Sequence, residues 1–138
     1  MIDYTGKLNC HENYLKILKI LEKKTSYIEI VLIDKKRTNE LVNKFKDKII
    51  STELVSKWWG TETRGKNKLF KIMATKELFD YLSKFETFCK YYISEGKGDF
   101  SELTNFGDDD IAFYDRFDNQ LLLTTTHEGY ILIKEDLI

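Results

Sequence analysis

The spacing of apolar residues predicts a helix over residues 9–24. Apolar side chains recur there three and four residues apart, so that they share one helix face, and lysines take the opposite face. Asn9 and Glu12 stand at the two ends of a capping box, in which each side chain bonds a backbone N–H of the first turn. The predicted inward positions are Cys10, Tyr14, Ile17, Leu18 and Leu21.

Two further helices are predicted from capping residues that precede apolar stripes. One starts at Thr38 or Asn39 and ends near Ile49. The other starts after Thr75 and ends before Gly96, a natural C-terminal stop. The predicted inward positions are Leu41, Val42, Phe45 and Ile49 in the second helix, and Leu78, Leu82, Phe85, Cys89 and Tyr92 or Ile93 in the third.

The first half of the chain also contains three predicted strands. Residues 27–33 are β-branched and too short for an apolar helix. Residues 52–60 and 68–74 form a predicted hairpin, joined by a polar, glycine-containing loop at 61–67. The aromatic-rich segment 86–93 is compatible with a strand as well as with the end of the third helix.

The last third of the chain predicts a β-meander. Strands are expected at 111–117, 121–127 and 130–134, with tight turns at 118–119 and 128–129. The resulting order, αβαββαβββ, predicts an α+β fold in which three helices pack on one face of a mostly antiparallel sheet of five to six strands. The length of 138 residues and the lack of an internal linker indicate one domain, 1–138.

Composition narrows the class of protein. No apolar run reaches the roughly 18 residues that a membrane span needs, and the first residues do not resemble a signal peptide, so a cytoplasmic protein is expected. Two cysteines make neither a disulfide framework nor a metal site. The sequence also lacks a recognisable cofactor loop, so no cofactor is expected. A lysine-rich, proline-free chain with only two alanines suggests a bacterial, AT-rich coding sequence.

Charge is divided unevenly along the chain, although the net charge is only −1. Residues 1–98 hold 20 of the 22 basic residues and 13 of the 23 acidic ones, whereas residues 99–138 hold 2 and 10. This asymmetry predicts a face that meets a basic partner, or a tail that folds onto the basic half of its own chain or of a second copy in a homodimer.

One candidate site combines carboxylates with an imidazole. In the predicted meander, the run Asp108, Asp109 and Asp110 lies at the same sheet end as His127 and Glu128. Such groups can bind a divalent metal or perform acid–base chemistry in a small hydrolase. Their spacing matches no metal signature, however, and the simpler interpretation is a solvated acidic loop that ends a strand.

A nucleophilic site at Cys10 and His11 is not favoured. Adjacent helical residues point about 100° apart, so the thiol and imidazole do not face each other. Cys10 is expected to be a buried, inert thiol, and His11 an exposed first-turn residue. No motif of a serine hydrolase is present, and the sequence assigns no catalytic residue.

Aromatic and basic residues in the first half raise the possibility of nucleic-acid binding. Adjacent strand residues point to opposite faces, so one of Trp58 and Trp59 is expected in the core and the other outside or under a helix. An outer Trp59 beside Arg64 and Lys66 fits a stacking platform. Against this, the pI is 6.2 and nearly all basic residues are lysine, which makes nucleic acid the less favoured partner.

The residues therefore favour a protein-binding domain. Acidic residues provide electrostatic steering, and neighbouring aromatic side chains provide anchors for a basic protein such as a nuclease. The predicted partner-binding residues are Asp108, Asp109, Asp110, Tyr114, Asp115, Asp118, His127, Glu128, Tyr130 and Trp59.

Two segments in the last third resemble the C-terminal strands of small bacterial immunity proteins that neutralise polymorphic toxins. The segments run from Asp110 to Tyr114 and from Leu121 to Tyr130. The resemblance covers about 20 residues and implies a cytosolic, non-enzymatic inhibitor of a cognate toxin. It assigns no functional residue.

Overall fold

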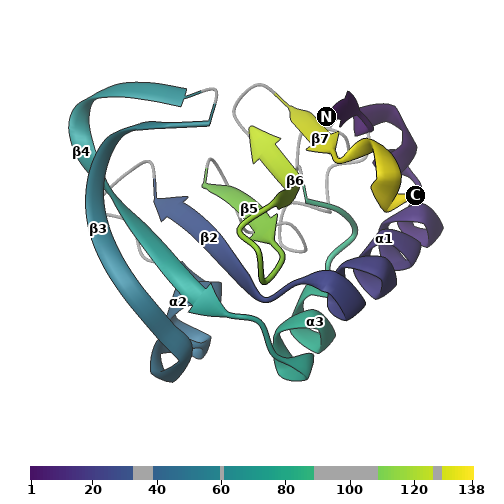
Figure 1. Ribbon diagram of the computed structural model, residues 1–138, viewed down its shortest axis with the longest axis horizontal. Helices are drawn as coiled ribbons and strands as arrows, with labels where there is room; N and C mark the ends of the chain where they lie inside the picture. The colour runs from purple at the N-terminus through teal and green to yellow at the C-terminus, as the bar shows by residue number, and fades with distance from the viewer. Residues whose placement is uncertain (33–38, 60, 89–108, 126–128) are drawn as a thin grey trace.

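The computed structural model describes residues 1–32, 39–59, 61–88, 109–125 and 129–138 (Figure 1). The described part of the chain forms an α+β fold with a seven-stranded sheet in which every pair of neighbouring strands is antiparallel. The strand order is β1-β7-β6-β5-β2-β4-β3. The strands are β1 (Ile2–Asp3), β2 (Tyr27–Leu32), β3 (Ile49–Trp58), β4 (Thr61–Met73), β5 (Asp110–Tyr114), β6 (Gln120–Thr125) and β7 (Tyr130–Ile133). The α-helices are α1 (His11–Lys24), α2 (Glu40–Lys44) and α3 (Lys76–Leu82), and 3₁₀ turns occupy Thr5–Asn9, Lys46–Lys48 and Glu135–Leu137.

The main core lies between the helices and one face of the sheet. Alternation along β2 sends Ile28, Ile30 and Leu32 into this core, and Tyr27 and Glu29 to the opposite face. All three helices contribute buried side chains to the same cluster, which confirms the predicted arrangement of helices and sheet. The sheet has more strands than predicted because Ile2–Asp3 adds a short edge strand beside β7.

The start of the first helix differs from the prediction. Residues 5–9 form a 3₁₀ turn, and Cys10 becomes the N-cap without a side-chain hydrogen bond, so the capping box at Asn9 is wrong. Because Cys10 precedes the helix, its thiol is exposed rather than buried on the apolar stripe. Tyr14, Ile17, Leu18 and Leu21 are buried as predicted.

The caps of the other two helices are confirmed, but both helices are shorter than predicted. The Asn39 side chain accepts hydrogen bonds from the N–H groups of Leu41 and Val42, and Thr75 accepts one from Leu78. Ile49 begins β3 instead of ending α2, because it pairs with Ile72 of β4. Residues 83–88 continue α3 as turns and bends, although Phe85 and Phe88 are buried there. The rest of the alternative strand at 86–93 lies outside the described residues.

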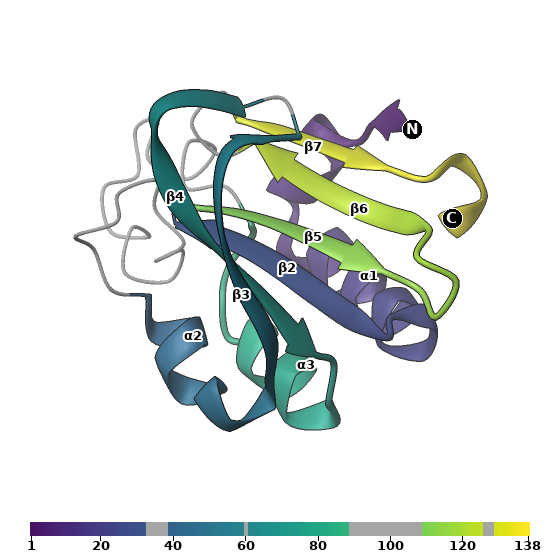
Figure 2. The ribbon, with the colours of Figure 1, turned by 60° about the vertical axis from the view of Figure 1, so that its left-hand side comes forward.

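The hairpin β3–β4 extends much further than predicted. The segment expected as the loop, 61–67, is the first half of β4, because β3 ends at Trp58 and β4 begins already at Thr61. The hairpin carries two irregularities in its register, between Ile49 and Ser51 and between Val55 and Lys57. Such bulges bend a strand and increase its twist. Figure 2 shows the hairpin passing in front of the sheet, with α1 behind β2 and β5.

The bent hairpin closes a second, smaller core on the sheet face opposite the helices. Trp58, at the end of β3, packs against a cluster formed by Ala112, Tyr114 and Leu123. These three positions belong to the predicted meander, whose strands are confirmed in order and are shorter than expected at several ends. The chain therefore places the end of its long hairpin over strands β5 and β6.

Candidate functional site

Two stacked tyrosines lie on the sheet face opposite the helices, where β2 begins and β5 ends. Tyr27 of β2 lies directly across from Tyr114 of β5, and their rings stack with centroids 4.9 Å apart and planes 7° from parallel. Lys71, on the neighbouring strand β4, places its Nζ 4.0 Å from the centroid of the Tyr27 ring. This cation–π contact continues the stack, so that three adjacent strands contribute to one ordered arrangement.

Trp59 is fixed onto this arrangement by a hydrogen bond. Its Nε1–H donates to the Tyr114 hydroxyl at 2.8 Å, and the Gln120 amide donates to the same oxygen at 3.1 Å. The Trp59 side chain nevertheless remains 52% exposed. The hairpin therefore presents a large apolar ring to solvent and holds it in one orientation.

The tyrosine hydroxyls of this site stay protonated. Burial raises the pKa of Tyr114 well above its ordinary value, and the hydrogen bond to the Glu29 carboxylate raises it further. Burial is also the main cause of the raised pKa of Tyr27. The second cause is the hydrogen bond that its hydroxyl donates to Asp118 Oδ1 at 2.8 Å. Both phenols therefore act as neutral hydrogen-bonding groups near neutral pH and are poorly suited to act as bases or nucleophiles.

The loop between β5 and β6 positions Asp118 against Tyr27. Asp118 adopts a positive φ of 65°, which a short polar side chain tolerates better than most. Asp115 organises the loop, because its Oδ1 accepts hydrogen bonds from the N–H groups of Phe117 and Asn119 and its Oδ2 accepts one from the Asn119 amide. The bonds from Asn119 are the main cause of the lowered pKa of Asp115.

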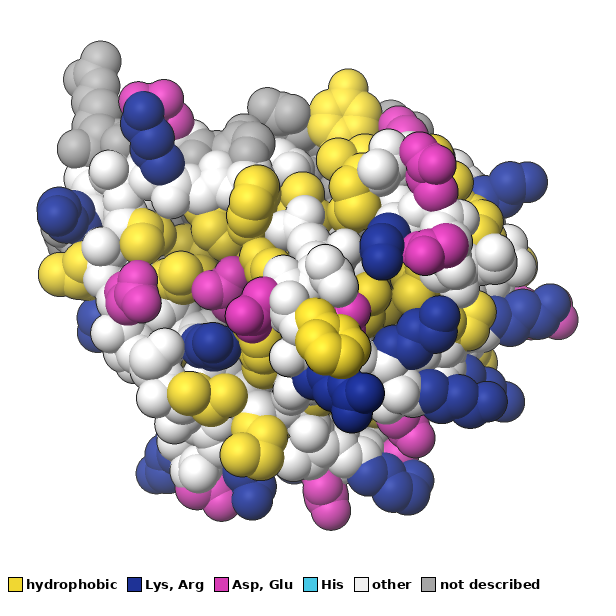
Figure 3. All heavy atoms as spheres, viewed as in Figure 1, with side chains coloured by type: hydrophobic (Ala, Val, Ile, Leu, Met, Phe, Trp, Pro, Cys, Tyr) yellow, Lys and Arg dark blue, Asp and Glu magenta, His cyan; other side chains and the backbone are white. Residues whose placement is uncertain are grey.

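We name these five residues the aromatic–acidic surface: Tyr27, Glu29, Trp59, Tyr114 and Asp118. Tyr114 itself is almost fully buried and contributes by holding Trp59 in place. Figure 3 shows hydrophobic and acidic side chains gathered between the hairpin β3–β4 on the left and the strands β5 and β6. Of the residues predicted from the sequence, Trp59, Tyr114 and Asp118 are thus brought together. Tyr130 is exposed at the start of β7, the strand next to the edge strand β1, and pairs with Thr125 of β6. Asp115 acts within its own loop.

Asp109 and Asp110 differ most from expectation. Both are fully buried, whereas the acidic run was expected to be a solvated loop. Asp109 Oδ2 accepts a hydrogen bond from the Asn39 amide at 2.8 Å, and Asp110 starts β5 opposite Val31 of the central strand β2. Buried carboxylates need such donors, and neither side chain is exposed for contact with a partner. Asp108, His127 and Glu128 lie outside the described residues.

The other chemical candidates gain no geometry that supports them. Within the described residues, no group of three or more His, Cys, Asp or Glu side chains is placed to hold a metal ion. His11 turns to Glu86, with its Nδ1 3.1 Å from the Glu86 carbonyl oxygen and 3.7 Å from a carboxylate oxygen, and its ring stacks on Tyr14. The His11 imidazole therefore contacts Glu86 and Tyr14, which gives no support to a role as base for the exposed Cys10 thiol.

Sequence reasoning missed Tyr27, Glu29, Lys71 and Gln120. Each is a polar or amphipathic residue within a strand. The alternation pattern places such a residue on the outer face of the sheet but does not say which side chains it meets there. The signal that could have identified them is the register, because Tyr27 pairs with Tyr114 and Glu29 with Lys71 across neighbouring strands. Register depends on how distant strands meet and is not set by local pattern alone.

Comparison of the chain with protein-family models, with curated proteins and with solved structures finds no match. In the described part of the chain, no helix combines the length and the apolar character needed to cross a bilayer.

Proposed function

We propose that this protein is a protein-binding domain that receives a basic partner on the aromatic–acidic surface. The observation that carries the proposal is Trp59, whose ring is half exposed while its N–H is held by the Tyr114 hydroxyl. Binding energy at interfaces concentrates on such large aromatic side chains. A ring that is already ordered loses less conformational entropy when a partner covers it.

Charge supports a basic partner. Two carboxylates lie beside the stacked tyrosines: Asp118 is exposed and Glu29 is half buried. Lys71, whose ammonium lies over the Tyr27 ring, is the cation that contacts this group. Residues 99–138, to which Asp118 belongs, carry 10 acidic and 2 basic residues, and an acidic balance of this kind favours a basic partner. Asp109 and Asp110 have no direct part in this proposal, because both are buried.

A narrower form of the proposal is that the partner is a toxin and the chain its cytoplasmic immunity-type inhibitor. It rests on the resemblance of residues 110–114 and 121–130 to the strands of such inhibitors. The described residues of these segments form β5, β6 and the start of β7, and most of them are buried. The resemblance therefore bears on the interior of the fold, and the nature of the partner has to come from experiment.

The test is a comparison of proteins captured by three versions of the purified domain from a bacterial lysate. The versions are the unchanged chain, Trp59→Ala and the matched control Leu54→Ala. Leu54 is a similarly exposed apolar residue on the same hairpin, 59% exposed, and lies outside the aromatic–acidic surface. We expect a basic protein to be captured by the unchanged chain and by Leu54→Ala, and to be released at high salt.

Loss of the hot-spot ring should weaken binding of that protein by about 30-fold or more, which corresponds to the 2 kcal/mol or more typical of such anchors. Isothermal titration with the recovered partner measures the change. A partner that binds Trp59→Ala and the unchanged chain equally would contradict the proposal. Recovery of nucleic acid in place of protein, with affinity that depends on Trp59, would favour a nucleic-acid accessory protein instead.

A further inference from the structure

The end of the hairpin β3–β4 projects beyond the strand that holds its base in the sheet. Strand β2 pairs with Lys68 to Met73 of β4, whereas the earlier residues Thr61, Glu62 and Asn67 pair with β3. Figure 2 shows this end of the hairpin crossing in front of the sheet rather than continuing its plane. The position of the hairpin end therefore depends on contacts other than pairing with β2.

The ladder between β3 and β4 is interrupted where the hairpin leaves the sheet. Val55 lies opposite Asn67, and the next pair towards the hairpin end is Lys57 with Glu62. Over this interval β3 advances by two residues and β4 by five, so that β4 carries three additional residues. An insertion of this kind bends a hairpin, and a short irregular stretch can absorb the changes in backbone angle that a hinge needs.

Two tryptophans hold the hairpin tip, residues 57–59 and 61–62, against the sheet. Trp58 packs on the smaller core around Tyr114, and its buried N–H has no hydrogen-bond partner among the described residues. Trp59 leaves half of its ring in solvent and donates to the Tyr114 hydroxyl at 2.8 Å. The described attachment of the tip is thus one ring with an unsatisfied donor and one neutral hydrogen bond, which together hold it weakly.

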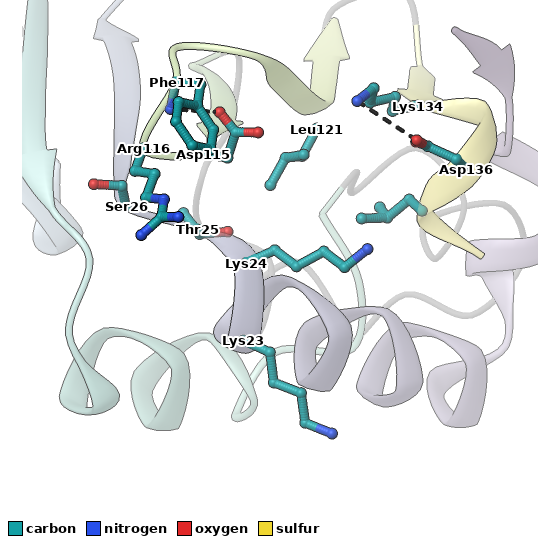
Figure 4. Close-up of a pocket in the computed structure, with 11 residues that line it drawn as sticks. Lys23, Lys24, Thr25, Ser26, Asp115, Arg116, Phe117, Leu121, Lys134 and Asp136 are labelled. Atoms are coloured by element: carbon teal, nitrogen blue, oxygen red, sulfur yellow. Dashed lines mark hydrogen bonds and ion pairs between the residues drawn. The ribbon is translucent and has the colours of Figure 1, made fainter.

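The sheet side of the aromatic–acidic surface is attached more firmly than the tip. Asp115 accepts three hydrogen bonds within the β5–β6 loop, and the Ser26 N–H donates to the Tyr114 carbonyl at 2.8 Å, which joins the end of α1 to β5. Figure 4 shows Asp115, Arg116 and Phe117 of this loop at the border of a hollow that the end of α1 also lines. Of the two parts that form the surface, the tip therefore has the fewer described attachments.

We propose that the hairpin tip opens and closes about the interruption in the ladder while the sheet stays intact, and that the hydrogen bond from Trp59 to Tyr114 is its latch. In the closed state the tip supplies Trp59 to the aromatic–acidic surface. In the open state it removes that ring and uncovers the smaller core on which Trp58 packs. The latch thus sets the fraction of molecules that present a complete surface. This consequence for binding rests on the proposed function, whereas the opening itself does not.

The test is hydrogen exchange of the ¹⁵N-labelled full chain, followed at the tryptophan side chains. The sequence contains only two tryptophans, and both belong to the tip, so their indole signals report on the tip alone. The Trp58 indole N–H is the more informative of the two, because it is buried when the tip is closed. Opening of the tip alone should give this proton a protection factor at least about 100-fold smaller than that of the most protected β2 amides, whose exchange requires the sheet to unfold.

Two matched tyrosine variants test the latch. Tyr114→Phe keeps the ring that stacks on Tyr27 and removes the hydroxyl that accepts from Trp59, so the opening equilibrium should increase about fivefold or more, as for loss of one hydrogen bond. Tyr27→Phe removes the hydroxyl of the other stacked ring, which bonds Asp118 outside the tip, and should change the opening equilibrium by less than about twofold. The Trp58 protection factor is the readout, and the β2 amides of the same sample show any general loss of stability.

A pair of glycine variants tests the position of the hinge. Gly65 lies within the additional residues of β4, and a Cβ added there would meet no heavy atom within 4 Å. Gly65→Ala therefore fits the closed state and restricts the backbone in the open one, which should lower the opening equilibrium about threefold. Gly6→Ala, at an equally unobstructed position in the 3₁₀ turn before α1, should leave the opening equilibrium unchanged.

Two kinds of outcome would overturn the inference. One is a Trp58 protection factor equal to that of the most protected β2 amides, and the other is an equal effect on tip opening within either pair of variants. None of these measurements involves a partner. An opening tip together with capture that does not depend on Trp59 would contradict the proposed function alone. Capture that depends on Trp59, together with a tip that never opens by itself, would contradict this inference alone.

Discussion

Asn39 shows how one side chain can serve a helix and a buried carboxylate at once. Its Oδ1 accepts hydrogen bonds from Leu41 and Val42 N–H at 2.9 and 3.2 Å, which caps α2. Its Nδ2 donates to Asp109 at 2.8 Å, and the residue is only 4% exposed. Asparagine alone among the common caps provides both an acceptor and a donor from one amide. Asp109 can thus be buried because the cap of α2 faces it.

We therefore expect Asn39→Ala to destabilise the protein by about 2–4 kcal/mol, the sum of a lost cap and a lost donor to a buried carboxylate. The free energy of unfolding from urea titration measures the effect. Thr75→Ala is the matched control, because Thr75 caps α3 with a single hydrogen bond and should cost about 1 kcal/mol. Equal losses in the two variants would show that the contact with Asp109 contributes nothing.

At the scale of elements, the hairpin β3–β4 has its own stabilising contact far from its base. Trp58 packs at the hairpin end against Ala112, Tyr114 and Leu123, and its indole N–H is buried with no hydrogen-bond partner among the residues described. The Trp58 ring therefore stabilises the fold through packing, and the buried N–H without a partner reduces that stabilisation. The adjacent Trp59 shows the opposite combination: its ring is exposed and its N–H is hydrogen-bonded.

This contrast predicts different responses to two changes at one position. Trp58→Phe keeps most of the packing and removes the unsatisfied donor, so we expect a change of stability within about 1 kcal/mol. Trp58→Ala removes the packing and should cost about 2–4 kcal/mol, somewhat less than for a fully buried ring. Urea titration of both variants decides the matter. A large loss with phenylalanine would mean that the indole N–H has a partner after all.

The sequence predicted the elements whose signals are local. The caps at Asn39 and Thr75, the buried stripe of α1 and the order of the last three strands all depend on neighbouring residues. The first half of β4 escaped prediction because it is a polar strand in a two-stranded ribbon. It needs no apolar alternation, since hydrogen bonds to β3 hold it. A polar, glycine-containing segment of this kind has the composition of a loop.

The candidate site was predicted only in part, for a related reason. Trp59, Tyr114 and Asp118 carry recognisable chemistry and were identified, whereas Tyr27 and Glu29 become significant only through their register with β5 and β4. The burial of Asp109 and Asp110 could not be inferred from their run of acids. It depends on tertiary partners, such as Asn39, that lie far away in the sequence.

For the whole molecule, the buried and partly buried tyrosines predict how stability depends on alkaline pH. Burial raises the pKa of Tyr14, Tyr27 and Tyr114, and it raises that of Tyr81 to about 12, from an ordinary value of 10. A group whose pKa is higher in the folded state contributes its full stability below the unfolded-state pKa and loses it as pH rises. The free energy of unfolding should therefore be insensitive to these groups below pH 10 and fall above it.

Urea titrations from pH 8 to pH 11, together with the absorbance of tyrosinate, test this expectation. We expect a fraction of the tyrosines to ionise only as the protein unfolds. Tyr27→Phe should retain the ring stack and lose one late-ionising group, which assigns part of the transition. Ionisation of every tyrosine in the folded protein with a midpoint near pH 10 would contradict the raised pKa values of these groups.

The order of strands also has a consequence for the time course of synthesis. The central strand β2 pairs on one side with β4 and on the other with β5, which begins only at Asp110. A ribosome must therefore release most of the chain before the second edge of β2 is covered, and β1 must wait still longer for β7. During that interval the apolar side of β2 and its unpaired backbone are open to other chains. Long-range pairing of this kind makes the nascent protein, more than the finished one, the state that depends on protection from aggregation.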